Sequence, residues 1–197
     1  MSKKIGITGG IGSGKSIVCE MFKILGISIY NADDRAKYLI HNDLQIRVEL
    51  KEFFGKEAYD SSGNYNRAFI AQQVFGNEAA LKVLNAIVHP RVFDDTEKWA
   101  KAHQQDAYII KEAAIMNAAG DGNDLDKVIV VTAPLDLRIK RIKQRDPQRS
   151  EEEILAIINK QKSADSYLKI ADFEIKNDET EMLIPQVLAL HERFTHI

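Results

Sequence analysis

The sequence predicts an α/β protein with a mainly parallel sheet wrapped by helices. Three observations support this fold class: short apolar runs rich in β-branched residues recur along the chain, helical patterns separate them, and a glycine-rich loop follows the first run. Such alternation is typical of parallel sheets, because the connection between parallel strands is usually a helix. The expected strands are Ile5–Thr8, Ile27–Tyr30, Ala107–Lys111, Lys127–Thr132 and Phe173–Lys176.

The size and charge of the chain restrict its function. Its 197 residues, 45% hydrophobic and 28% charged, suit one ordinary domain with small insertions. The formal net charge is −2, so no overall positive field would hold nucleic acid, and we expect no nucleic-acid partner. The single cysteine, Cys19, cannot form an internal disulfide and is expected to be a small buried residue. No apolar stretch reaches the length of a membrane span, so we expect a cytoplasmic protein with no membrane partner.

A phosphate-binding loop directly follows the first expected strand, because the pattern G-x-x-x-x-G-K-[ST] is complete there. Glycines allow a tight turn whose N–H groups face inward, and the helix expected over 16–25 directs its positive N-terminal end at the phosphates. Lys15 is expected to reach the β- and γ-phosphates of ATP, and the Ser16 hydroxyl to ligate Mg²⁺. A glycine-rich turn without a ligand is the alternative. The residues of the loop are Gly9, Gly10, Ile11, Gly12, Ser13, Gly14, Lys15 and Ser16.

Two aspartates follow the second expected strand. A carboxylate at the carboxyl end of a strand beside the phosphate loop can accept the proton of a hydroxyl that attacks the γ-phosphate, so Asp33 is the candidate general base. From residue type alone, capping the helix expected over 35–41 is the commoner role for Asp33 or Asp34. The two residues can also divide the roles, one capping and one acting as base.

The stretch between the second and third expected strands is unusually long, since a single crossover helix needs far fewer residues. We interpret about 34–103 as a helical insertion that holds a second substrate. Pro90 interrupts an otherwise helical segment, so we expect a kink or a helix boundary near His89. The insertion is broken at Gly55, at 60–64 and at 76–77.

An arginine-rich helix is expected over 135–145, where apolar residues recur at i, i+4 and i+7 and three arginines form a neighbouring stripe, Arg138, Arg141 and Arg145. Guanidinium groups beside a nucleotide would neutralise the charge that spreads over phosphoryl oxygens during transfer, as a lid that closes over ATP does. A solvated basic face is the alternative, and both stay open for Arg141 and Arg145.

The same region predicts a helical hairpin. Asp146-Pro147 ends the arginine-rich helix, and Ser150 to Glu153 has the spacing of a capping box that opens the next helix. We therefore expect the lid, at about 145–169, to be two helices joined by a turn. A final helix over 181–194 closes the fold.

Other nucleotide-binding classes fit less well. Asp60–Gly63 mimics the D-x-x-G element of a guanine-nucleotide switch but follows no expected strand, and Lys162 stands where the guanine-reading aspartate belongs. A motor ATPase should have an apolar strand that ends in acidic residues, whereas Lys127–Thr132 continues into Ala-Pro. The five histidines show no metal-ligand spacing, so no zinc site is expected. A small-molecule kinase fits best.

The ordered motifs resemble those of the dephospho-CoA kinases over nearly the whole chain. In chain order they are Ile7–Ser16, Asn31–Asp33, Val88–Arg91, Arg141 with Gln144–Asp146, Gln161, and Ala171–Asp172 with Asn177. The resemblance implies transfer of the γ-phosphate of ATP to the ribose 3′-hydroxyl of dephospho-CoA, with Mg²⁺, which is the last step of coenzyme A synthesis. It also implies a phosphate-loop kinase fold whose core is about 1–33, 104–144 and 170–197, with a helical CoA-binding insertion and a lid.

The resemblance further implies roles for single residues. Asp33 is the base and Lys15 the phosphate clamp, while Arg141 and Arg145 belong to the lid or stabilise the transition state. Asn177 is expected near the adenine of ATP. The residues expected to contact the acceptor are Thr8, Asp33, His89 and Arg91.

Two positions depart from the family pattern. Asn31 stands where the family usually has aspartate, and Ala118 where it usually has a carboxylate. Glu112, just after the third expected strand, is a candidate substitute for the missing acid. The departures leave room for a weakened enzyme or a shifted acceptor, so another phosphate-loop nucleotide or small-molecule kinase, or a nucleotide-binding homologue without turnover, are the alternative functions. The oligomeric state is not predicted.

Overall fold

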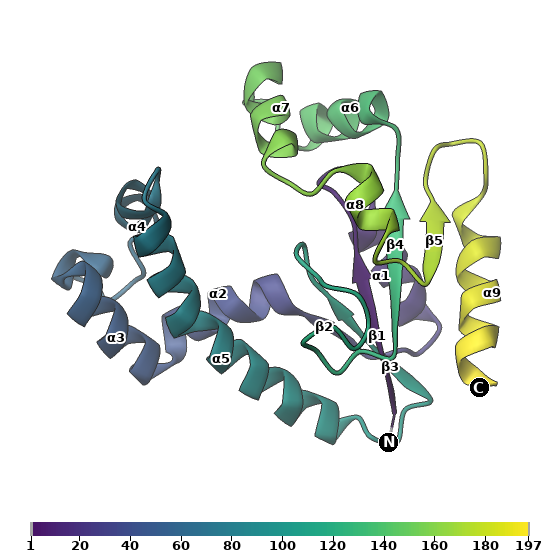
Figure 1. Cartoon of the computed structure of the whole chain (residues 1–197), viewed down its shortest axis with the longest axis horizontal. Helices are drawn as coiled ribbons and strands as arrows, with labels where there is room; N and C mark the ends of the chain where they lie inside the picture. Colours follow the sequence, from purple (N-terminus) through teal and green to yellow (C-terminus); the bar gives the residue numbers. More distant parts are fainter. Residues whose placement is uncertain (1, 197) are drawn as a thin grey trace. The chain divides into compact units, whose positions relative to one another are not determined.

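The structure is a computed structural model that describes residues 2–196, and its centre is a five-stranded parallel sheet. The spatial order of the strands is β2-β3-β1-β4-β5 (Figure 1). Since every neighbouring pair is parallel, the carboxyl ends of the strands lie at one edge of the sheet. The expected fold class is confirmed. The strands are β1 (Lys3–Thr8), β2 (Ile29–Asn31), β3 (Tyr108–Glu112), β4 (Lys127–Thr132) and β5 (Phe173–Lys176).

Helices connect the strands, and the chain forms two compact units. The first unit is the chain up to Asn31 together with the chain from His103 onward, and the second is Ala32–Ala102. The helices of the first unit are α1 (Lys15–Ile24), α6 (Leu135–Arg145), α7 (Glu151–Asn159), α8 (Ala164–Leu168) and α9 (Leu183–Thr195). The helices of the second unit are α2 (Ala32–Asn42), α3 (Leu44–Phe54), the short 3₁₀ helix η1 (Lys56–Ala58), α4 (Arg67–Val74) and α5 (Glu78–Ala102).

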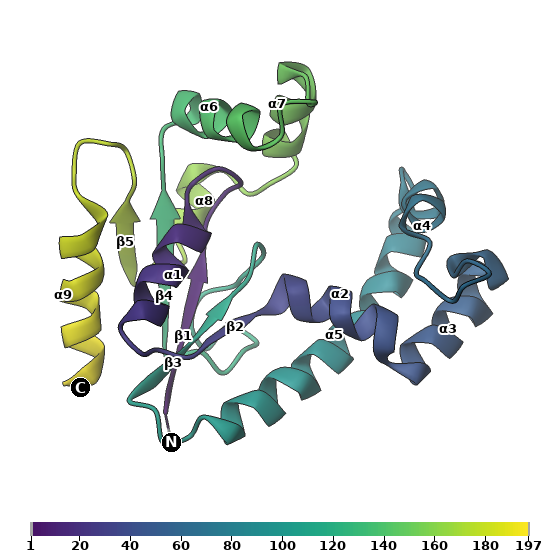
Figure 2. The same ribbon diagram turned by 180° about the vertical axis from the view of Figure 1, so that it is seen from behind.

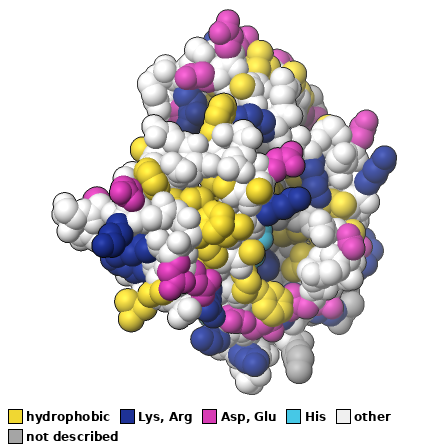
Figure 3. Space-filling model, turned by 60° about the vertical axis from the view of Figure 1, so that its left-hand side comes forward, with side chains coloured by type: hydrophobic (Ala, Val, Ile, Leu, Met, Phe, Trp, Pro, Cys, Tyr) yellow, Lys and Arg dark blue, Asp and Glu magenta, His cyan; other side chains and the backbone are white. Residues whose placement is uncertain are grey.

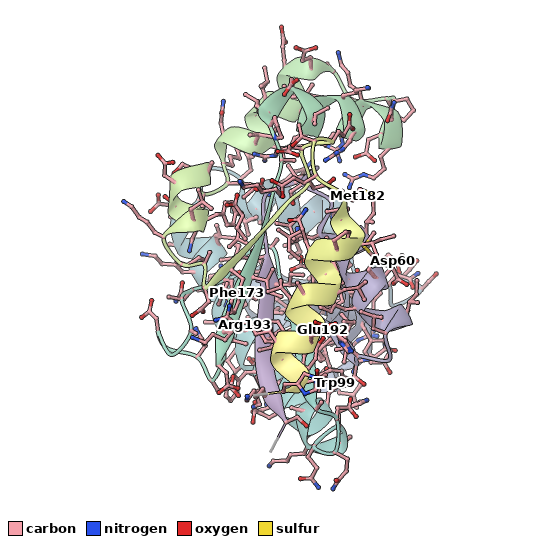
Figure 4. All side chains as sticks on the ribbon, turned by 90° about the vertical axis from the view of Figure 1, so that its right-hand side faces the viewer. Asp60, Trp99, Phe173, Met182, Glu192 and Arg193 are labelled. Carbon is pink, nitrogen blue, oxygen red and sulfur yellow. The ribbon has the colours of Figure 1, made fainter. Side chains whose placement is uncertain are left out.

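Helices α1 and α9 pack against one face of the sheet, and α8 lies on the opposite face (Figures 1 and 2). Val18, Cys19 and Phe22 recur at i, i+1 and i+4 on α1, so that one stripe of this helix is buried against the strands. Cys19 is buried, as expected from the sequence. At the other end of the core, Arg193 of α9 stacks on the ring of Phe173, with the guanidinium carbon 4.7 Å from the ring centroid (Figure 4).

The expected helical hairpin is present, and α6 and α7 lie beyond the carboxyl end of β4 (Figure 1). The Ser150 side chain accepts a hydrogen bond from the backbone of Glu153, whose carboxylate accepts one from the Ser150 backbone. This capping box satisfies N–H groups at the start of α7 and fixes the turn between the two helices.

The helical unit has its own apolar core, to which α3, η1, α4 and α5 contribute buried side chains such as Ile46, Leu50 and Ile87. The breaks expected at Gly55, 60–64 and 76–77 all fall outside the helices. The division into a substrate-binding insertion and a lid stays a prediction as far as the roles of these parts are concerned.

Two of the outcomes expected from the sequence are wrong in this unit. The first is the helix boundary expected near His89, since α5 runs through Pro90, while the kink expected as the other outcome stays a prediction. Ile87 and Val88 on one side of the proline and Thr96 and Ala100 on the other are buried. Packing of both halves outweighs the hydrogen bond that the proline removes.

The second correction concerns the aspartates after β2. Helix α2 begins at Ala32, so Asp33 and Asp34 lie in its first turn and neither is the N-cap residue. Their negative charge still faces the positive end of the helix and stabilises it there.

Acidic and basic side chains alternate over the surface that Figure 3 shows, without a large field of one sign. Within residues 2–196, no helix combines the length and the apolar composition that crossing a lipid bilayer requires.

Candidate active site

The phosphate-loop sequence leaves β1 at the carboxyl edge of the sheet and leads into α1. Gly14 has φ +94, a left-handed conformation that residues with a side chain rarely adopt, and α1 begins at the next residue. The N-terminal N–H groups of α1 and the preceding loop therefore form a site suited to phosphate.

A cavity of about 720 Å³ lies over this loop, and all of its lining residues belong to the first unit, which contains the sheet. Lys15 and Ser16 line it from the loop side, and Arg141 and Arg145 line it from α6. The structure thus brings together the loop and the arginines that the sequence predicted for the ATP side. The other lining residues are Gly10, Ile11, Gly12, Gly14, Ile17, Ala114, Ile142, Gln144 and Gln161.

The two side chains that end the loop motif differ in their surroundings. Nζ of Lys15 donates a hydrogen bond to the carbonyl of Gly9 at 3.0 Å, so the ammonium group lies over the loop. Ser16 is exposed in the first turn of α1 at the cavity, where its hydroxyl is accessible to a bound ion. Hydroxyl and phosphate oxygens are hard donors of the kind that Mg²⁺ prefers, so the residues present fit that ion.

Arg141 is held at the cavity by the segment after β5. Its guanidinium donates to the carbonyl of Asn177 at 3.0 Å, to Oδ1 of Asn177 at 3.2 Å, and to Glu179 at 3.3 Å. Glu179 has φ +68 and is the one non-glycine residue with positive φ within the described chain. The Glu179 carboxylate therefore competes with a nucleotide phosphate for the positive charge of Arg141.

Asn177, expected near adenine, contacts the loop itself. Its side chain is 8% exposed and its amide donates to the carbonyl of Ser13 at 2.8 Å. Asn177 therefore connects the phosphate loop to Arg141, and its position relative to adenine stays a prediction.

Arg145 forms a forked pair with the next residue. Its Nε and Nη2 donate to the two carboxylate oxygens of Asp146 at 3.1 and 3.0 Å. Hydrogen bonds from Arg145 hold the pKa of Asp146 below its usual value. The Arg145 side chain is 61% exposed, so it can turn toward the cavity at little cost.

Two further residues contact the loop through hydrogen bonds that the sequence did not predict. Arg138 and Gln161 both hydrogen-bond to Ile11. Arg138 belongs to the predicted arginine stripe, and Gln161 to the family motif, but neither signal indicates a contact with the loop.

A buried carboxylate lies at the end of β3. Glu112 is 8% exposed, and its Oε2 accepts a hydrogen bond from the amide of Asn31 at 2.8 Å. Burial, with the Glu112 carboxylate as the next cause, raises the pKa of the Cys19 thiol strongly. Lys15 lowers the same pKa, so Glu112 and Lys15 both lie within electrostatic reach of this part of α1.

Glu112 supplies a feature that a motor ATPase should have, an acidic residue at the end of an apolar strand. The strand next to β1 on its other side, β3, is an apolar run that does end in an acidic residue. In contrast, Ala118 lies in the loop after β3, where its carbonyl accepts a hydrogen bond from Asn123.

The residues expected on the acceptor side are divided between the two units. Thr8 is fully buried at the end of β1, and its hydroxyl donates to the carbonyl of Ala114 at 3.4 Å. Asp33 is exposed in the first turn of α2, and His89 is exposed on α5. Arg91 is also on α5, and its Nη2 lies 3.5 Å from Oε1 of Glu49. Across the described part of the chain, no three histidine, cysteine or acidic side chains form a metal-binding group.

Comparison with known proteins identifies a family. The dephospho-CoA kinase family profile matches residues 3–182. The chain is 38% identical to the dephospho-CoA kinase of Bacteroides fragilis strain YCH46 over 96% of this chain and 92% of that one. It is 36% identical to the enzyme of that name from Salinibacter ruber, over 89% of each chain.

Solved structures agree with the sequence comparison. A dephospho-CoA kinase from Campylobacter jejuni superposes with a TM-score of 0.72 at 26% identity, covering 100% of this chain and 98% of that one. A Thermus thermophilus protein superposes with a TM-score of 0.77 at 28% identity and the same coverage.

Proposed function

Because the chain belongs to the dephospho-CoA kinase family, we propose that it transfers the γ-phosphate of ATP to the ribose 3′-hydroxyl of dephospho-CoA and so forms coenzyme A. The observation that carries this proposal is the cavity over the phosphate loop, which joins Lys15 and Ser16 to two arginines of α6. A site of this kind binds a triphosphate and stabilises the charge that moves during its transfer.

On the ATP side, the loop N–H groups and Lys15 bind the phosphates, and Arg141 and Arg145 neutralise charge on the transferred group. Lys15 leaves the Gly9 carbonyl to do so, and Arg141 exchanges its contact with Glu179 for phosphate oxygens. In each exchange the cation loses a neutral carbonyl or an exposed carboxylate and gains oxygens of a doubly charged phosphate group, which favours the bound state.

On the acceptor side, Asp33 accepts the proton of the 3′-hydroxyl as that oxygen attacks phosphorus. Its exposed position in the first turn of α2 leaves its carboxylate accessible to a substrate. Thr8, His89 and Arg91 contact the acceptor, and Asn177 lies near adenine.

Mg²⁺ would be held by the Ser16 hydroxyl together with phosphate oxygens of ATP. When bound, it supplies positive charge that neutralises the polyphosphate. A cytoplasmic location stays a prediction.

The test is ADP release from ATP and Mg²⁺ with dephospho-CoA as acceptor, beside AMP, shikimate, pantothenate and an acceptor-free control. We expect stimulation by dephospho-CoA alone and a product identified as coenzyme A by mass spectrometry. Absence of stimulation in protein that still binds ATP would instead support a different acceptor or a homologue without turnover.

Matched lysine variants test the role of the loop. Lys15→Ala should weaken both ATP binding and turnover, whereas Lys23→Ala should leave both unchanged, because Lys23 lies near the exposed end of α1 beside Glu20. Unchanged ATP binding in Lys15→Ala would contradict the assignment of the phosphate loop.

A further inference from the structure

Ile11, the third residue of the phosphate-loop motif, has both of its backbone polar groups bound by side chains from distant segments. Its N–H donates to Oε1 of Gln161 at 2.8 Å, and its carbonyl accepts from Nε of Arg138 at 2.8 Å. Nη2 of Arg138 also donates to Oε1 of Gln161 at 3.3 Å, which closes the three groups into a ring. Gln161 is 150 residues from Ile11 in the sequence.

We propose that Gln161 and Arg138 are positioning residues that hold the backbone of Ile11 through its N–H and its carbonyl. They thereby fix the conformation of the first part of the phosphate loop before nucleotide binds. This inference concerns how the loop is held and rests on the proposed function only in taking the loop as the ATP site. Ile11 and Gln161 both line the cavity over the loop, so the ring lies at the nucleotide site itself.

The neighbouring glycines indicate how closely Arg138 approaches the loop. A Cβ atom on Gly10 would collide with the Arg138 guanidinium, and one on Gly12 would lie 2.7 Å from the Arg138 carbonyl oxygen. The loop is therefore in van der Waals contact with α6 over three successive residues. Burial lowers the pKa of Arg138, which agrees with a guanidinium enclosed against the protein.

The energetic reason for holding the loop in this way is preorganisation. A glycine-rich loop samples many conformations, and a ligand that binds only one of them has an apparent Kd equal to its intrinsic Kd divided by the fraction of loops in that conformation. Hydrogen bonds that select the binding conformation beforehand remove this penalty. Loss of one neutral hydrogen bond should therefore raise the Kd for ATP about 3- to 10-fold.

The origin of the two side chains adds a second consequence. Arg138 lies in α6, and Gln161 follows the end of α7 by two residues. Both therefore come from the expected lid hairpin or its borders, so movement of α7 would release the N–H of Ile11.

The test uses Gln161→Met, which keeps the length of the side chain but removes the acceptor oxygen, with Gln148→Met as the matched control. Gln148 is exposed in the turn between α6 and α7 and is not among the residues that line the cavity. In Gln161→Met we expect faster exchange of the Ile11 amide hydrogen in the nucleotide-free protein, measured by NMR, and the rise in ATP Kd given above, measured by calorimetry. Gln148→Met should behave as wild type in both measurements.

Gln161→Glu is the conservative variant. It retains an acceptor oxygen, so Ile11 exchange should stay slow, although its charge is expected to weaken ATP binding independently. In steady-state kinetics, Gln161→Met should raise KM for ATP by a larger factor than it lowers kcat, because the cost of ordering the loop arises at binding.

Unchanged Ile11 exchange in Gln161→Met would overturn the proposal, as would an ATP Kd no weaker than that of Gln148→Met. Faster exchange of all amides together, with a lower Tm, would also overturn it, since that indicates a general structural role. Amide exchange and ATP affinity are measured without an acceptor. A failure of the proposed role of Gln161 and a failure of the kinase assignment are therefore distinguishable.

Discussion

The side-chain amide of Asn31 donates a hydrogen bond to Oε2 of Glu112 at 2.8 Å, and the two residues are register partners at the carboxyl ends of β2 and β3. The family pattern predicts an aspartate at position 31. A second carboxylate there would face Glu112 directly, so the asparagine supplies a donor where an acid would repel. The departure at Asn31 and the buried acid at Glu112 are thus two parts of one arrangement.

Asn31→Asp should reverse this compatibility. Two carboxylates within hydrogen-bond distance cannot both ionise freely, so the pKa of the pair should rise above the value of about 4 in the unfolded chain. A raised pKa in the folded state costs stability as pH increases through it. At pH 8 we expect the variant to unfold at a lower urea concentration than wild type, with a free energy of unfolding that is smaller by about 1–3 kcal/mol. This difference in free energy should shrink at pH 5.

The double variant Asn31→Asp with Glu112→Gln provides the control for that prediction. It reverses the direction of the hydrogen bond and keeps one charge, so it should recover most of the lost stability. A double variant as unstable as Asn31→Asp at pH 8 would show that charge repulsion is not the cause.

Asp33→Asn should lower kcat by about 10²- to 10⁴-fold with little change in the Kd for ATP, because a general base acts on the acceptor hydroxyl in the transition state. Asp34→Asn is the neighbouring control, since Asp34 is exposed and lies 2.7 Å from Lys37. Steady-state kinetics and ATP calorimetry on both variants decide the role. Near-wild-type turnover in Asp33→Asn would remove Asp33 from it.

Arg141→Ala should reduce kcat/KM for ATP about 100-fold, because a forked cation at the transferred phosphate stabilises the transition state. Arg141→Lys keeps the charge without the fork and should recover only part of the loss. Lys140→Ala, at an exposed position of the same helix, should change kcat/KM little. Equal effects of the Arg141 and Lys140 substitutions would mean that α6 contributes only a general positive field.

Cys19 should react slowly with iodoacetamide in the folded protein. The thiolate is the reactive form, and burial together with the Glu112 carboxylate raises the pKa of this thiol, so raising the pH from 7 to 9 should accelerate labelling much less than in urea. Mass spectrometry of timed samples measures the rate. Rapid labelling at pH 9 without denaturant would contradict the buried placement of this part of α1.

The sequence predicted what depends on local pattern. The phosphate loop, all five strands, the α6–α7 hairpin and the breaks at Gly55, 60–64 and 76–77 follow from spacing and turn residues near one another in the chain. Boundaries shifted where distant residues intervene: β2 extends to Asn31, which pairs in register with Glu112 of β3.

The remaining differences have the same physical origin. Pro90 lies inside α5 because buried residues on both sides of it keep the helix continuous, and local propensity carries no information about that packing. The contacts of Ile11 with Gln161 and of Ser13 with Asn177 join residues that are 150 and 164 positions apart. A motif can mark such residues as important, but only the fold reveals what they contact.

The absence of a side chain at Gly14 has an evolutionary consequence. The space that a Cβ atom would take is occupied by the amide of Asn177, whose hydrogen bond to Ser13 depends on that space. Residues 14 and 177 therefore cannot drift independently, although one lies near the start of the chain and the other precedes its last helix. A graft that replaces the segment after β5 would have to keep the asparagine, because the phosphate loop near the other end of the sequence would otherwise lose this hydrogen bond.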